Sequence, residues 1–182
     1  MKRQNQRTHR ARRPNNGDLA APRTPEEFYA MSETDQDIWN RAVHVPSKMR
    51  STRRSLAHVA REFDLSPEVV LDLVGSALRK QGNRYVAKPS DKLLRVLVVT
   101  TPEGPQETAV RGSRAASVIG SHSDAVQKYL RTGDPSALRA FKDLEITDAS
   151  GKPIELLTDT DELDRLGSAG VLSFESLYAT VG

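Results

Sequence analysis

The stretch that decides the fold is residues 55–74, which read SLAHVAREFDLSPEVVLDLV. Its apolar residues form two stripes at helical spacing, the first made by Leu56, Val59, Ala60 and Phe63 and the second by Val70, Leu73 and Val74. Between the stripes, Asp64 and Leu65 supply a turn, Ser66 an N-cap and Pro67 a first helical residue. The pattern therefore predicts two short helices joined by a tight turn.

Three positions of this stretch match a known motif. Ala60 is small where the two helices would touch, Leu65 is apolar after the turn, and the β-branched Val70 would anchor the second helix. The segment resembles the helix-turn-helix of bacterial repressors and sigma-like factors. That resemblance implies a DNA-binding protein whose second helix approaches a groove.

The segment departs from the motif at two places. Asp64 stands where a turn glycine is usual, although aspartate can adopt the left-handed conformation. Glu68 and Asp72 lie on the outer face of the second helix, where base-reading helices usually carry Arg, Gln, Asn, Ser or Thr. A carboxylate can still accept from cytosine, and we expect the basic tail or a hairpin to share in recognition.

The segments around this stretch complete a predicted α+β fold. Thr24, Pro25 and Glu27 start a helical region that Pro46 should end, and the second helix of the motif should continue to Lys80 and stop near Gly82. Beyond it, the sequence predicts a short strand at 84–86, a hairpin of 93–101 with 107–111, a helix over 113–131, a shorter helix from 134, a hairpin of 144–147 with 154–157 and a helix from 158 or 159. A hairpin after a helix-turn-helix is typical of winged-helix proteins, but the strand 93–101 is apolar on both faces and fits a sheet of the following region equally well. The domains predicted are a disordered basic tail (1–23), a helical helix-turn-helix domain (24–88), and a small mixed α/β region (89–182).

Charge is distributed unevenly along the chain. Residues 1–23 carry seven Lys or Arg and one acid, residues 24–98 carry twelve and ten, and residues 99–182 carry eight and thirteen. A basic end predicts a polyanionic partner, with double-stranded DNA as the first hypothesis. The candidate nucleic-acid-binding residues are the side chains that lie in the tail, before and within the motif, and at its predicted end: Arg10, Arg12, Arg13, Lys48, Arg50, Arg53, Arg54, Ser66, Glu68, Arg79 and Lys80.

Catalytic and metal-binding arrangements have little support in the sequence. The chain has no cysteine, which excludes disulfides, a thiolate nucleophile and thiolate zinc sites. His122 and Asp124 share one predicted helix without a nucleophile-elbow pattern, and the acidic run 159–164 lacks the glycine and terminal glutamate of a calcium loop. Residues 112–120 lack the P-loop lysine, although Arg111 and Arg114 would be the natural clamps if an anion bound there. We therefore expect no enzymatic activity, no metal and no cofactor.

The order of segments resembles that of small helix-turn-helix proteins of high-GC bacteria and their mobile elements. This resemblance implies a DNA-binding transcriptional regulator or a mobile-element accessory factor. A homodimer is a further partner that the sequence leaves open. No apolar run approaches the ~20 residues of a membrane span, and the first residues lack a secretory signal, so we expect a cytoplasmic protein that uses no membrane. The alternative is a phage or ribonucleoprotein assembly or adaptor protein whose basic tail binds RNA or an acidic partner.

Overall fold

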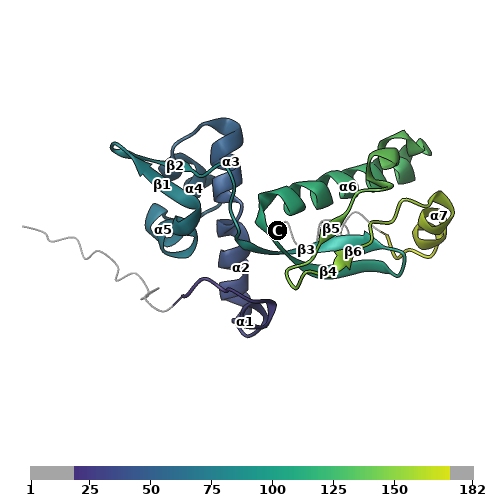
Figure 1. Ribbon diagram of the computed structural model, residues 1–182, viewed down its shortest axis with the longest axis horizontal. Helices are drawn as coiled ribbons and strands as arrows, with labels where there is room; N and C mark the ends of the chain where they lie inside the picture. The colour runs from purple at the N-terminus through teal and green to yellow at the C-terminus, as the bar shows by residue number, and fades with distance from the viewer. Residues whose placement is uncertain (1–18, 173–182) are drawn as a thin grey trace, which may run out of the picture.

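The computed structural model describes residues 19–172 and shows an α+β architecture (Figure 1), which confirms the predicted fold class. The first half consists of α1 (Pro25–Tyr29), α2 (Glu33–Ala42), α3 (Val45–Thr52), α4 (Leu56–Glu62), α5 (Pro67–Val74), the 3-10 turn η1 (Gly75–Ala77), β1 (Leu78–Gln81) and β2 (Arg84–Ala87). The second half consists of β3 (Leu94–Thr101), β4 (Gly104–Arg111), α6 (Gly112–Thr132), η2 (Pro135–Phe141), β5 (Ile146–Thr147), β6 (Pro153–Ile154) and α7 (Thr160–Ser168). The strands form three separate two-stranded antiparallel sheets, in which β1 pairs with β2, β3 with β4, and β5 with β6.

Local capping explains where the helices of the motif begin. The Ser55 hydroxyl accepts from the His58 amide and caps α4, and the Ser66 hydroxyl accepts from the Val69 amide and caps α5, both at 3.3 Å. Asp64 adopts a left-handed conformation at the turn, with φ 54°. The two helices and the turn between them therefore form where the sequence predicts them.

Two predictions about the flanks of this motif are wrong. Pro46 does not end a helix but occupies the first turn of α3, where no intrahelical N–H is needed. The second helix of the motif ends at Val74 rather than at Lys80, and Arg79 and Lys80 lie on strand β1.

A hairpin replaces the predicted end of that helix. Strand β1 pairs with β2 so that Leu78 faces Ala87 and Lys80 faces Tyr85. Gly82 is the first residue of the two-residue turn and has φ 61°. Two-residue hairpin turns favour glycine at a position with positive φ. Leu78 is buried, and Tyr85 and Ala87 pack against the core of the first half. Burial of this face outweighs the helical preference of the residues before Gly82.

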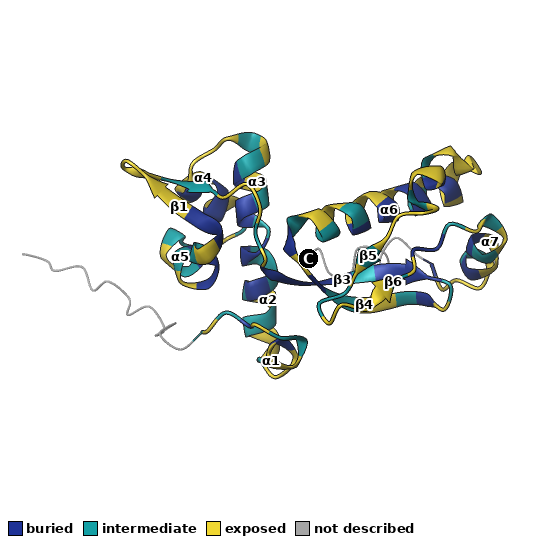
Figure 2. Cartoon of the chain, in the orientation of Figure 1, coloured by how far each residue is buried: buried dark blue, intermediate teal, exposed yellow. Residues whose placement is uncertain are grey.

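Strand β3 belongs to the cores of both halves (Figure 2). Its first part, Leu94 and Val96, packs with Trp39 and the helices of the first half, whereas Leu97 and Val99 pack with α6. The Trp39 indole Nε1 donates to the Leu94 carbonyl at 3.1 Å. This strand is buried along nearly its whole length, as its uninterrupted apolar sequence predicts.

The start of α6 depends on one glycine. Gly112 has φ 84°, and its amide donates to the Leu93 carbonyl at 2.9 Å. A Cβ atom at this position would lie 2.6 Å from the Asp91 backbone oxygen. Only glycine tolerates both the positive φ and this close approach.

We expect Gly112→Ala to lower the free energy of unfolding by about 2–4 kcal/mol, because the new methyl group meets backbone in a strained conformation. Gly120→Ala is the matched control on the same helix, where a Cβ would meet nothing within 4 Å. That change should be neutral or stabilise the protein by up to about 1 kcal/mol. Urea unfolding followed by circular dichroism measures both, and equal values for the two variants would contradict this account.

His122 is a fully buried polar residue of α6. Its Nε2 donates to the Leu157 carbonyl at 2.8 Å, and its Nδ1 has no hydrogen-bond partner among residues 19–172. Burial lowers the pKa of His122, although the hydrogen bond to Leu157 opposes this effect. His44 is partly buried, and burial together with the positive charge of Arg95 also lowers its pKa. Both imidazoles are therefore neutral in the folded state at neutral pH.

These lowered pKa values make the unfolded state bind more protons than the folded state below the ordinary histidine pKa of about 6.5. Stability should therefore fall as the pH drops from 7.5 to 5.5, by up to about 1.4 kcal/mol for each histidine. The variant His122→Gln keeps a donor for Leu157 and cannot titrate, so its unfolding free energy should change less over this range. Urea midpoints at several pH values test this, and an identical pH dependence in the variant would show that His122 contributes nothing to it.

Candidate nucleic-acid interface

The structure describes eight of the eleven candidate residues. Arg10, Arg12 and Arg13 lie outside the described range. The others are distributed over α3 and the residues after it, the first turn of α5 with its cap, and strand β1: Lys48, Arg50, Arg53, Arg54, Ser66, Glu68, Arg79 and Lys80. They fall into five local environments with different consequences for binding.

The outer face of α5 is acidic. Glu68 and Asp72 are both exposed, and the helix contains no lysine or arginine. Glu68 has a polar or electrostatic interaction, so its carboxylate is not free. Ser66 is half-buried, and its hydroxyl accepts from the Val69 amide and caps the helix. Phosphates are repelled by carboxylates, so this face adds no electrostatic attraction to a duplex.

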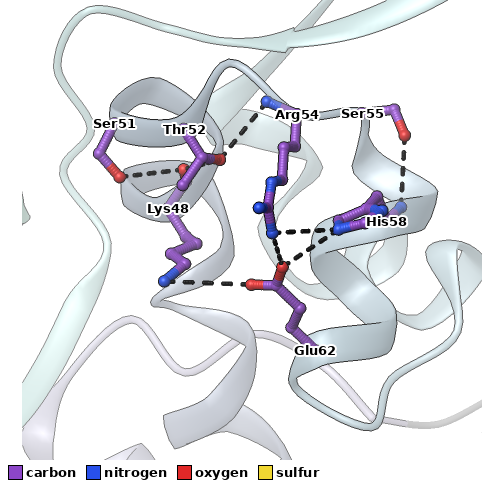
Figure 3. A network of polar contacts seen from close by, with 7 residues as sticks. All are labelled: Lys48, Ser51, Thr52, Arg54, Ser55, His58 and Glu62. Carbon is purple, nitrogen blue, oxygen red and sulfur yellow. Dashed lines mark hydrogen bonds and ion pairs between the residues drawn. The ribbon is translucent and has the colours of Figure 1, made fainter.

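The cations next to α4 share one carboxylate (Figure 3). Arg54 Nη1 pairs with Glu62 Oε1, His58 Nε2 lies 3.2 Å from the same oxygen, and Lys48 Nζ lies 4.0 Å from Glu62 Oε2. The Lys48 and Arg54 side chains are 45% and 52% exposed, so solvent screens these pairs. Glu62 thus offsets part of the charge that the sequence assigns to phosphate binding.

Arg50 has a structural role that the sequence did not predict. Its guanidinium donates to the Lys88 carbonyl at 2.8 Å, to the Ser47 hydroxyl at 2.9 Å and to Asp91 Oδ2 at 3.3 Å. Asp91 also accepts from Arg95 at 2.9 Å, and these two side chains are 1% and 2% exposed. Arg95 in turn donates to the Val43 carbonyl at 2.9 Å. Arg50 therefore joins α3 to the segment between β2 and β3.

Burial lowers the pKa of Arg95, while the charge of Asp91 raises it and that of Arg50 lowers it further. The two guanidiniums share the Asp91 carboxylate. The sequence signal for this cluster is Asp91, which stands four residues before Arg95. Asp91 lies at the start of the predicted third region, 89–182, where the sequence suggests a domain boundary.

Arg53 is the candidate of the 48–54 run with the fewest contacts. It ends α3 in a left-handed conformation, with φ 57°, and its amide donates to the Met49 carbonyl. The side chain is exposed and has no polar partner among the described residues. Arg53 is therefore available to a phosphate group.

The β1–β2 hairpin and the residues beside it form a basic element whose cations have no acidic partner among the described residues. Residues 75–90 contain four cations, Arg79, Lys80, Arg84 and Lys88, and no acid. All four are exposed, and none of their side chains forms an ion pair within residues 19–172. The strand register places Arg79 opposite Val86 and Gln81 opposite Arg84, on the face that points away from the core. Arg84 and Lys88 were not among the candidates, although the absence of acids over these sixteen residues is a signal that could have found them.

Comparisons with known proteins add no relatives: no protein-family model matches the chain, and neither the curated proteins nor the solved structures yield a match. Within residues 19–172, no helix combines the length and the apolar character needed to cross a membrane. The same residues contain no group of three or more His, Asp or Glu that could hold a metal ion.

The different surroundings of Arg50 and Arg53 lead to a direct stability comparison. Arg50→Ala should lower the free energy of unfolding by about 2 kcal/mol, because it removes three hydrogen bonds and leaves Arg95 as the remaining partner of Asp91. Arg53→Ala, three residues away, should change it by no more than about 0.5 kcal/mol. Urea unfolding measures both variants, and a stable Arg50→Ala protein would show that Arg50 is free for other contacts.

Proposed function

We propose that this protein binds double-stranded DNA and that the β1–β2 hairpin supplies the main contacts to the phosphate backbone. The observation that supports the proposal is a set of four exposed cations on and beside the hairpin, directly after the helical pair α4 and α5, with no ion pair among residues 19–172. Cations that have no internal partner can release counterions from DNA without first breaking an ion pair. The proposed roles in the cell are those that the sequence suggests, transcriptional regulation or assistance to a mobile element.

The order of elements supports a duplex as the target. Helices α3, α4 and α5 are followed by a two-stranded hairpin, which is the order of elements in a winged-helix module. Strand β2 packs against α3 and α4, so the hairpin has a fixed direction relative to the helical pair. Arg53, before the N-terminus of α4, supplies a further exposed cation. Lys48 and Arg54 contribute less, because Glu62 already neutralises part of their charge.

In this proposal α5 does not provide the affinity. Its exposed carboxylates, Glu68 and Asp72, would reduce non-specific attraction at the groove. They could also discriminate among bases, since a carboxylate accepts a hydrogen bond from cytosine and not from guanine O6 or N7. Affinity then comes mainly from the hairpin, whose strand β2 packs against α3 and α4.

The same acidic face favours a second candidate function. A helix pair that repels phosphate could serve only as a scaffold in an assembly or adaptor protein, with the basic tail binding RNA or an acidic partner. The two proposals differ in where binding resides. In the first it resides mainly in the folded hairpin, and in the second it resides in the basic tail.

The decisive experiment measures binding to a random DNA duplex by fluorescence anisotropy over a series of salt concentrations. We expect Arg79→Ala/Arg84→Ala to weaken binding and to reduce the magnitude of the slope of log K against log salt by about 2, since each lost phosphate contact removes about 0.9. Arg131→Ala/Arg139→Ala is the matched control, because it removes the same charge from exposed positions of the second half. An unchanged slope in the hairpin variant would refute the proposed interface.

The same assay on residues 19–182 separates the two functions. The truncation starts at Leu19 because Leu19 and Ala21 pack against the first core and the Arg111 guanidinium donates to the Arg23 carbonyl at 2.6 Å. Duplex binding that survives truncation supports the hairpin. Loss of all binding, or equal binding to single-stranded RNA, supports the adaptor function instead.

A further inference from the structure

A polar pocket of about 520 Å³ lies where α3, the segment between β2 and β3, and the start of α6 meet. Five serines, three arginines and one aspartate provide most of its lining. Its volume falls within the range of about 300–1,000 Å³ that is usual for small-molecule sites. Guanidiniums and hydroxyls are hydrogen-bond donors, so this lining favours a hydrophilic ligand with many acceptor atoms.

The buried cluster at this pocket carries more positive than negative charge. Asp91 Oδ1 accepts from Arg95 at 2.9 Å, and Asp91 Oδ2 accepts from Arg50 at 3.3 Å. Two guanidiniums thus share one carboxylate, although the Arg95 side chain is only 2% exposed. The Arg50 side chain is 24% exposed and lines the pocket. Excess charge in partly buried surroundings is costly, so an anion that binds beside Arg50 would be stabilised.

Two more arginines of the lining have no carboxylate partner. Arg111 ends β4 and Arg114 lies in the first turn of α6. Both are exposed, and neither forms an ion pair among residues 19–172. Arg111 donates to the Arg23 carbonyl at 2.6 Å, but a neutral acceptor leaves its charge uncompensated. These are the two side chains that the sequence marks as the natural clamps for an anion.

The first turn of α6 adds backbone donors to these cations. The helix has 21 residues, no side-chain cap and no acidic residue in its first turn. The Gly112 amide is occupied by the Leu93 carbonyl, and the next two residues, Ser113 and Arg114, line the pocket at the positive end of the helix dipole. Amides and several guanidiniums together match the oxygens of a phosphate group.

We propose that this pocket binds the phosphate group of a small hydrophilic molecule, of the class of pyrophosphate or a sugar phosphate. Arg111 and Arg114 bind the phosphate oxygens from the α6 side, and Arg50 binds them from the α3 side. The serine hydroxyls bind the rest of the polar ligand. Among the described residues that line the pocket there is no aromatic side chain, so the site does not select for a nucleobase. This inference does not depend on DNA binding.

The test follows the backbone amide signals of the full chain by nuclear magnetic resonance during titration with pyrophosphate at constant ionic strength. The signals of Ser113 and Arg114 should shift and saturate, because the ligand binds beside them. The signals of Arg79 and Arg84, on the exposed basic hairpin, should shift little and serve as an internal control. Equal shifts without saturation at both places would show general attraction of anions to cations, and the proposal would be wrong.

Two pairs of matched variants locate the binding energy. Arg114→Ala should weaken pyrophosphate binding by about tenfold, since it removes a charge-assisted contact. Arg131→Ala removes the same charge from the last turn of the same helix and should leave the affinity unchanged. Ser117→Asp places a carboxylate in the pocket and should abolish binding, whereas Ser121→Asp, exposed and one turn further along, should preserve it. Equal effects within either pair would show that net charge, and not the pocket, determines binding.

A final arm distinguishes a small ligand from the phosphate backbone of DNA. A short duplex replaces pyrophosphate in the same titration. If the duplex shifts the Ser113 and Arg114 signals while pyrophosphate and inorganic phosphate leave them unchanged, the pocket belongs to a DNA-binding surface and the small-molecule proposal is overturned. The fluorescence of Trp39, buried in the first core, reports that each variant remains folded.

Discussion

The buried carboxylate of Asp91 is the interaction on which the arrangement of the molecule depends. It accepts from Arg50 of α3 and from Arg95 of β3, and Arg95 also holds the Val43 carbonyl at the end of α2. An isolated buried charge would be costly, so each member of this cluster needs the others in place. The backbone oxygen of the same residue lies where only a glycine, Gly112, can begin α6. One short segment thus positions the helices of the first half, strand β3 and the longest helix.

Two carboxylates, Asp91 and Glu62, determine which cations of the run 48–54 remain for binding. Arg50 is used internally, and Lys48 and Arg54 are partly neutralised by Glu62, so the run 48–54 is less available than its composition suggests. The hairpin that follows α5 lies in a stretch, residues 75–90, that contains no acid, and its cations form no ion pair among the described residues. Attraction to a polyanion is therefore expected to depend on a different element from the one that a helix-turn-helix motif normally suggests.

Much of the fold could be predicted from local rules. The caps at Ser55 and Ser66, the left-handed Asp64 and the buried strand β3 follow from residue types and spacing that act over a few positions. The end of α5 could not be predicted in this way, because residues 75–80 favour a helix locally and only burial of Leu78 and Tyr85 against distant helices favours a strand. The role of Arg50 was missed for a similar reason. Its partners, Lys88 and Asp91, lie about forty residues further along the chain, and no periodicity connects them.

The hydrogen bonds from Arg50 to the Lys88 carbonyl and to Asp91 have a thermodynamic consequence. Lys88 directly follows β2 and Asp91 precedes β3, so one side chain fixes the end of the hairpin relative to the strand that both cores share. If a ligand or partner of the second half displaced the start of β3, the direction of the hairpin would change with it. Linkage is reciprocal, so such a ligand would alter the affinity of the hairpin for its target by the same factor by which the target alters the affinity for the ligand. The geometry of a single guanidinium would then be the element through which two separate binding events influence each other.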